Sequence, residues 1–134
     1  MFAAFVDADA LEAWLPPEGM TGRLERFDAD AGYRMVLTYL EPPEGGGKAS
    51  ADSDVSEVRR TEVVAGRRIV EEVDFPSDDP AFAGTMVMTW TFEPQGDGTL
   101  VTITATDVPR GIDQDVHVGA LESSLRQLAA HVER

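Results

Sequence analysis

The sequence predicts an α+β fold in which an antiparallel sheet of about six strands packs against one long C-terminal helix. Between residues 22 and 108, successive segments alternate apolar and polar residues with a period of two, and short turns join most of them. After Gly111 the apolar residues recur at helical spacing. Consecutive strands flanked by helices indicate an antiparallel sheet rather than alternating β-α-β units.

A short N-terminal helix is predicted over residues 2–15, where apolar residues recur at helical spacing. Asp7 and Asp9 divide it into two short turns, and either carboxylate could cap the second turn by accepting a hydrogen bond from a free backbone N–H. Pro16 and Pro17 end the helix, because proline lacks the N–H that the next turn needs.

The expected strands follow in order. The first runs from Gly22 through Phe27, and the others cover residues 33–39, 55–64, 68–75, 85–93 and 100–108. A loop is expected over residues 41–50, with Gly45–Gly47 at its centre, and a hairpin turn over residues 95–98. The C-terminal helix should present one apolar stripe to the sheet, with Asp113 or Asp115 as its cap.

Composition narrows the class of protein. The chain has 134 residues and a hydrophobic fraction of 43%, which suits one globular domain. Its formal net charge of −14 argues against nucleic acid, since binding to phosphates depends on Lys and Arg. The absence of cysteine excludes disulfides, thiolate nucleophiles and Cys-based zinc sites. We find no signal peptide and no apolar run of membrane-spanning length, so we expect a cytoplasmic protein that does not bind membranes.

Several segments resemble the activator of Hsp90 ATPase homologue family, in its bacterial stand-alone form, within the START-related helix-grip (SRPBCC) superfamily. The matching residues span nearly the whole chain: Ala4–Leu11, Trp14–Gly22, Tyr33–Met35, Arg68–Glu71, Asp78–Phe82, Met86–Glu93, Gly98, Thr99, Leu125 and Leu128. The resemblance implies a single helix-grip domain over residues 1–134. In that fold a curved sheet wraps around the long helix and leaves a ligand cavity between them.

The start of the chain departs from the family pattern. Members usually begin with a β-strand and a Pro-containing turn, whereas this chain begins inside the first helix. The resemblance places the missing first strand at the sheet edge beside residues 100–108. Either the start is truncated or mis-assigned, or the sheet is completed by association, since an open edge offers unpaired N–H and C=O groups to another chain. A homodimer formed through this edge is therefore one expectation.

Strand parity indicates which side chains could line the implied cavity. Methionine and aromatic residues share one face of two strands, and such residues suit pockets for apolar molecules. The competing interpretation is that they simply fill a core. The candidate ligand-binding residues are Trp14, Met20, Met35, Leu37, Tyr39, Glu71, Phe75, Phe82, Met86, Met88, Trp90, His117, Leu121 and Leu125.

Glu71 is the only catalytic candidate. It alternates in phase with Ile69 and Val73, so it should point to the apolar face. A buried carboxylate has a raised pKa and could serve as a general base or a ligand anchor. The alternatives are a bulge that turns it outward or a salt bridge to an arginine such as Arg34.

The remaining polar residues suggest no chemistry. His117 lies near the apolar stripe of the long helix, but neither histidine has a carboxylate partner at metal-ligand spacing, so we predict no metal and no cofactor. Asp52, Asp54 and Glu57 are interpreted as a solvated strand edge.

Three classes of function remain. The preferred one is binding of an apolar or aromatic small molecule, because a Met- and Trp-lined strand face opposite an amphipathic helix describes a container. The family name suggests an Hsp90 co-chaperone-like interaction module as an alternative. The superfamily also suggests a cyclase or lyase acting on polyketide-type substrates, although no convincing acid–base pair favours an enzyme.

Overall fold

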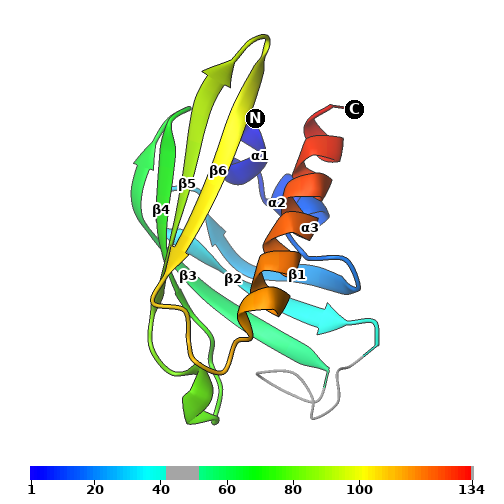
Figure 1. Ribbon diagram of the computed structural model, residues 1–134, viewed down its shortest axis with the longest axis vertical. Coiled ribbons are helices and arrows are strands. Elements are labelled where there is room, and N and C mark those ends of the chain that lie inside the picture. The colour runs from blue at the N-terminus through cyan, green and yellow to red at the C-terminus, as the bar shows by residue number, and fades with distance from the viewer. Residues whose placement is uncertain (42–51, 134) are drawn as a thin grey trace.

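The computed structural model describes residues 1–41 and 52–133, so the predicted Gly45–Gly47 loop lies outside the described residues. It confirms the α+β fold, with a six-stranded sheet and a long C-terminal helix (Figure 1). The elements are α1 (Ala3–Val6), α2 (Ala8–Trp14), β1 (Met20–Asp28), β2 (Gly32–Tyr39), β3 (Ser53–Val64), β4 (Arg68–Asp74), the 3-10 turn η1 (Pro80–Phe82), β5 (Met86–Gln95), β6 (Gly98–Thr106) and α3 (Gln114–Val132).

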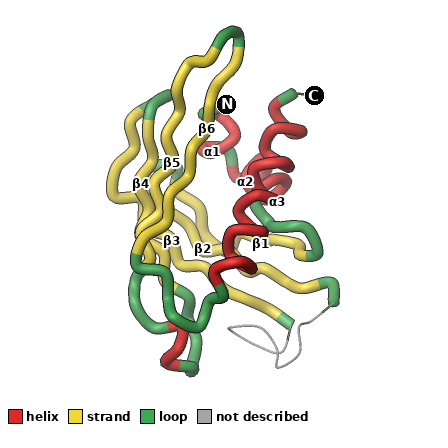
Figure 2. Tube along the Cα trace, in the orientation of Figure 1, coloured by secondary structure: helices red, strands yellow, loops and turns green. Residues whose placement is uncertain are grey.

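The sheet is antiparallel throughout, with the strands in sequence order from β1 to β6. Figure 1 shows the sheet curving around α3, with β4 to β6 upright and β1 and β2 crossing behind the lower half of the helix. Turns and loops lie at the ends of the strands (Figure 2). In the described part of the chain, β1 and β6 are the two edges. Pairing of the β6 edge with another chain stays a prediction.

Two β-bulges decide which side chains face inward. The register shifts between Leu24 and Arg26 in β1, and again between Arg60 and Glu62 in β3. An extra residue in one strand reverses the alternation beyond it. The first bulge explains why Leu24 and Phe27, three positions apart, both pack against the core.

Two capping residues were possible from the sequence for each of the helices α2 and α3, and in both helices the earlier aspartate is the cap. The Asp7 carboxylate accepts a hydrogen bond from the Ala10 backbone N–H at 3.2 Å and starts α2. The Asp113 carboxylate accepts one from the Val116 N–H at 3.0 Å and starts α3. Such caps satisfy N–H groups that have no partner within the helix.

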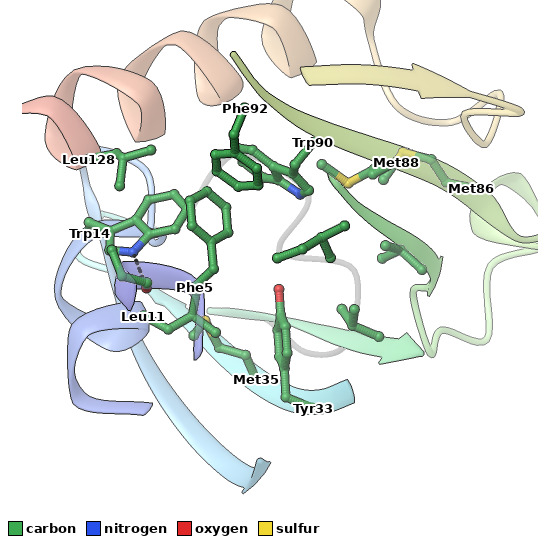
Figure 3. Close-up of a cluster of buried hydrophobic side chains, with 14 residues drawn as sticks. Phe5, Leu11, Trp14, Tyr33, Met35, Met86, Met88, Trp90, Phe92 and Leu128 are labelled. Carbon is green, nitrogen blue, oxygen red and sulfur yellow. Dashed lines mark hydrogen bonds between the residues drawn. The ribbon is translucent and has the colours of Figure 1, made fainter. Parts of the chain in front are cut away.

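The aromatic part of the core, around Phe5, fills one end of the space between the sheet and α3, while the core methionines also face the remaining space (Figure 3). The Phe5 ring lies 4.8 to 5.0 Å from the rings of Trp14, Trp90 and Phe92, measured between centroids. Edge-to-face contacts of this kind add to the stabilisation that apolar burial supplies. The indole Nε1–H of Trp14 donates a hydrogen bond to the Ala4 carbonyl at 2.8 Å, which ties α2 to α1.

Candidate functional site

A cavity of about 850 Å³ occupies the other end of the space between sheet and helix. Strands β1 to β5 supply its floor and walls, and the first half of α3 covers it. Its inner end is lined by Tyr33, Glu71 and Trp90, all buried. Its mouth is lined by Leu40 and Val116, whose exposed fractions are 68% and 69%. This volume lies within the range of pockets for small organic molecules.

Most candidate residues named from the sequence meet at this cavity. Those that line it are Met20, Met35, Leu37, Tyr39, Glu71, Phe75, Met86, Met88, Trp90, His117 and Leu121. They come from β1, β2, β4, β5, α3 and the segment after β4. Strand parity was sufficient to place the strand residues on one face.

Three candidate residues lie elsewhere. Trp14 is turned into the aromatic core, where its ring contacts Phe5 and Trp90. Phe82 belongs to η1, beyond the end of β4, and lines a separate, more open depression. Leu125 packs against the core cluster rather than the cavity, because the second half of α3 covers the filled end of the sheet.

Glu71 faces the interior, as its strand phase predicted, and its side chain is only 4% exposed. Its Oε2 accepts a hydrogen bond from Nε of Arg60 at 3.2 Å, and its Oε1 accepts one from Nε1 of Trp90 at 3.0 Å. The suggested partner Arg34 was wrong. Arg34 points to the opposite face of the sheet and pairs there with Glu25 and Glu57.

Arg60 is the ion-pair partner that sequence reasoning missed. It stands opposite Glu71 in the β3–β4 register, and its side chain is 0% exposed. Its Nη1 donates to the Ala29 carbonyl and its Nη2 to the Phe5 carbonyl, both at 2.7 Å. The guanidinium therefore joins β3 to α1 and to the β1–β2 turn. A signal did exist, because Arg60 is two residues after the apolar Val58 and so shares its face.

The inner end of the cavity carries two groups with raised pKa values. Burial raises the pKa of Glu71, while the Arg60 charge and the hydrogen bonds from Trp90 and Arg60 act in the opposite direction. Burial also raises the pKa of the Tyr33 hydroxyl well above its usual value, and the nearby Glu71 charge adds to this effect. Tyr33 therefore keeps its proton at neutral pH and can act as a donor.

Asp54 corrects the prediction of a solvated strand edge at Asp52, Asp54 and Glu57. Strand β3 lies between β2 and β4, and Asp54 is buried on the face that lines the cavity. The Tyr39 hydroxyl donates a hydrogen bond to Oδ2 of Asp54 at 2.6 Å. Burial raises the pKa of Tyr39, and Asp54 adds to the shift. Glu57, on the other face, is paired with Arg26 and with Arg34.

The long helix adds His117, which is half-buried and lines the cavity. It has an interaction partner of its own. Among residues 1–41 and 52–133, no three side chains of the metal-binding types gather into a cluster. The helices in the same ranges include none with the length and apolar character needed to cross a membrane.

A curved antiparallel sheet closed by a long C-terminal helix around an apolar cavity defines the START-related helix-grip class. Within that class, the chain belongs to the activator of Hsp90 ATPase homolog 1-like family, whose model matches residues 1–133.

Two solved structures illustrate the similarity. The chain is similar to a protein of Chromobacterium violaceum, with 32% identity, a TM-score of 0.84 and coverage of 99% of this chain and 87% of that one. An AHSA1 protein of Silicibacter pomeroyi shares the fold at 21% identity and a TM-score of 0.73, covering 98% of this chain and 87% of that one. No curated protein matches the chain.

Proposed function

We propose that this protein binds an apolar or aromatic small molecule in the cavity between the sheet and α3. The observation that carries this proposal is the cavity of about 850 Å³ inside a small domain. Small-molecule sites are typically concave, mostly apolar pockets of this size with a few polar groups at fixed positions. The cavity has that form, with Tyr33 and Glu71 at its buried end and exposed apolar residues at its mouth.

The lining supports an apolar occupant. Met35, Met86 and Met88 present flexible, polarisable thioethers, which adapt to ligands of different shape. Trp90 and Phe75 add aromatic surface at the wall. The exposed Leu40 and Val116 give the mouth an apolar rim through which such a ligand could enter.

The geometry favours binding over acid–base catalysis. Both carboxylate oxygens of Glu71 already accept hydrogen bonds, from Arg60 and Trp90. The Arg60 charge stabilises the ionised form of Glu71, which weakens its tendency to take a proton from a ligand. Glu71 is therefore better suited to holding a ligand than to removing a proton from it.

The test is to fill the cavity from the helix. Ala120 lies on α3 and lines the cavity, whereas Ala130 lies on the same helix, exposed and outside it. We expect Ala120→Phe to weaken binding of naphthalene, measured by isothermal titration calorimetry, at least about tenfold because the new ring occupies the site. Ala130→Phe should leave the affinity unchanged. Equal binding by both variants, or no binding by the unmodified protein, would overturn the proposal.

A further inference from the structure

The inner end of the cavity presents the hydroxyl of Tyr33, which makes no hydrogen bond to the described residues and faces the cavity space. We infer that this end is a polar subsite that selects ligands carrying a neutral hydroxyl group, which donates its hydrogen bond to Glu71 and accepts one from Tyr33. The inference rests on the proposed function, since the hydroxyl belongs to the apolar ligand that fills the cavity. It adds the chemical class of that ligand and the direction in which it enters.

Tyr33 supplies the hydrogen-bond donor of this subsite. Its side chain lines the cavity and the residue is only 4% exposed, yet its hydroxyl has no hydrogen-bond partner within the described part of the chain. Figure 3 shows the ring standing away from β2, with its oxygen pointing toward the middle of the cluster. No side-chain nitrogen or oxygen of the described residues is both closed off and without a partner, so this hydroxyl faces the open space of the cavity. A ligand oxygen can accept its proton there, whereas a purely apolar group that displaces water from it would lose affinity.

Glu71 supplies the hydrogen-bond acceptor of the subsite. Glu71 lines the same end of the cavity and lies close enough for its charge to act on Tyr33. Its two oxygens accept one hydrogen bond each, from Arg60 and Trp90. An ionised carboxylate offers about four lone-pair sites, so Glu71 retains capacity for a further donor. A hydroxyl is the group that can donate to Glu71 and accept from Tyr33 through a single atom.

The charges at the inner end of the cavity favour a neutral ligand group. Arg60 already balances Glu71, and its Nε, Nη1 and Nη2 are all engaged with protein acceptors. Its side chain is fully buried and does not line the cavity. A cationic ligand would therefore bring a second positive charge into a site whose acid is already neutralised. An anionic ligand would face the Glu71 carboxylate without reaching Arg60, so the ligand group is neutral.

Tyr39 and Asp54, a polar pair nearer the mouth of the cavity, indicate how the ligand is oriented. Tyr39 and Asp54 satisfy each other through their own hydrogen bond. Tyr39 lies on β2 six residues after Tyr33, which places it about 20 Å along the strand. The unpartnered donor thus lies at the inner end, and the ligand should enter with its hydroxyl first and leave its apolar body toward the mouth.

The experiment compares naphthalene with derivatives that differ by one group at neutral pH. We expect 2-naphthol, which donates and accepts, to bind at least about tenfold more tightly than naphthalene, measured by isothermal titration calorimetry. The acceptor-only 2-methoxynaphthalene, the anion 2-naphthoate and the cation 2-naphthylmethylammonium should all bind more weakly than 2-naphthol. This series uses the unmodified protein, so it does not depend on the folding of any variant.

The matched variant is Tyr33→Phe, which removes one oxygen and keeps the ring. It should reduce the preference for 2-naphthol over naphthalene to near one. Thr104→Val removes a hydroxyl from the exposed outer face of β6 and should keep the preference. A preference that survives in Tyr33→Phe would overturn the inference.

The outcomes separate the two claims. Equal binding of naphthalene and 2-naphthol, or tighter binding of either charged probe, would overturn the hydroxyl subsite and leave the cavity proposal standing. Failure of every probe to bind would overturn both. Nuclear magnetic resonance gives a local readout, because 2-naphthol should shift the Nε1–H signal of Trp90 at Glu71 more than that of Trp14, which is bonded in the core. An equal shift of the two signals would count against the subsite.

Discussion

The same pair of residue types occurs twice, side by side, on the two faces of the sheet. Arg59 stands opposite Glu72, and Arg60 stands opposite Glu71, in one β3–β4 register. The outer pair is 49% and 42% exposed, with 3.6 Å between Nε of Arg59 and Oε1 of Glu72. The inner pair is 0% and 4% exposed, with 3.2 Å between Nε and Oε2. A shift of one residue along each strand thus separates a surface ion pair from a buried one.

The difference teaches what each pair does. The outer pair lies in water, where ion pairs contribute little and salt screens them. The inner pair is surrounded by hydrogen bonds to the Phe5 and Ala29 carbonyls and to the Trp90 indole, so its charges are fully accommodated. Because the inner pair is buried, removing one of its two charges should lower stability strongly. Replacing both charges together by apolar side chains should lower it much less. Its position gives the cavity an acceptor held in one orientation.

The largest expected effect follows from breaking the inner pair. Glu71→Gln replaces one of the two accepting oxygens by an NH2 group, so a donor faces the buried N–H of Arg60 or of Trp90 and the Arg60 charge loses its counter-ion. We expect the free energy of unfolding to fall by about 3–5 kcal/mol, measured by urea denaturation. Glu72→Gln, the neighbouring change on the outer face, should cost less than about 1 kcal/mol. Similar losses in the two variants would contradict the comparison.

A double variant sharpens this result. Arg60→Met combined with Glu71→Leu removes both charges together, so it should be more stable than Glu71→Gln alone. Recovery should be incomplete, because the Phe5 and Ala29 carbonyls and the Trp90 N–H lose their partners. A double variant less stable than the single one would show that Arg60 matters mainly for those carbonyls.

The two faces should also respond to pH with opposite sign. Because burial raises the pKa of Glu71, the folded state binds its proton more tightly, and the contribution of this group to stability is lost as pH rises from the unfolded to the folded pKa. Hydrogen bonds from Arg59 and then Thr85 lower the pKa of Asp74 on the outer face. Its contribution is present above its unfolded pKa and is lost as pH falls through the folded one.

Thermal unfolding across the acidic range measures this contrast. Asp74→Asn should flatten the loss of stability at the acidic end, and Glu71→Gln should flatten the decline as pH rises. The informative quantity is the slope of stability against pH in each variant, because the absolute stability also reflects the hydrogen bonds that each substitution removes. Slopes that change in the same direction would contradict the assignment of the two shifts.

The sequence was sufficient for the fold and for the direction of Glu71, because both depend on local periodicity. It was not sufficient for Arg60, Tyr33 and Asp54, whose roles depend on which strand lies beside which and where a bulge resets the register. Trp14 was a candidate cavity residue because its side chain is aromatic. Instead, α2 packs against α1, and the Trp14 side chain lies in the core. Such placements come from contacts between segments distant in the chain, which periodicity does not encode.

The smallest expected effect tests the outer face by itself. Arg59→Met removes the partner of Glu72 and Asp74, whose bonded oxygens lie 3.6 and 2.8 Å away. Because these charges are half exposed, unfolding free energy should change by less than about 1 kcal/mol, and urea denaturation at about 1 M salt should shrink the difference further. Arg60→Met provides the inner counterpart and should be insensitive to salt, since its site is closed to solvent. If salt changed the unfolding free energy of both variants by the same amount, the proposed difference between the exposed and the buried ion pair would be wrong.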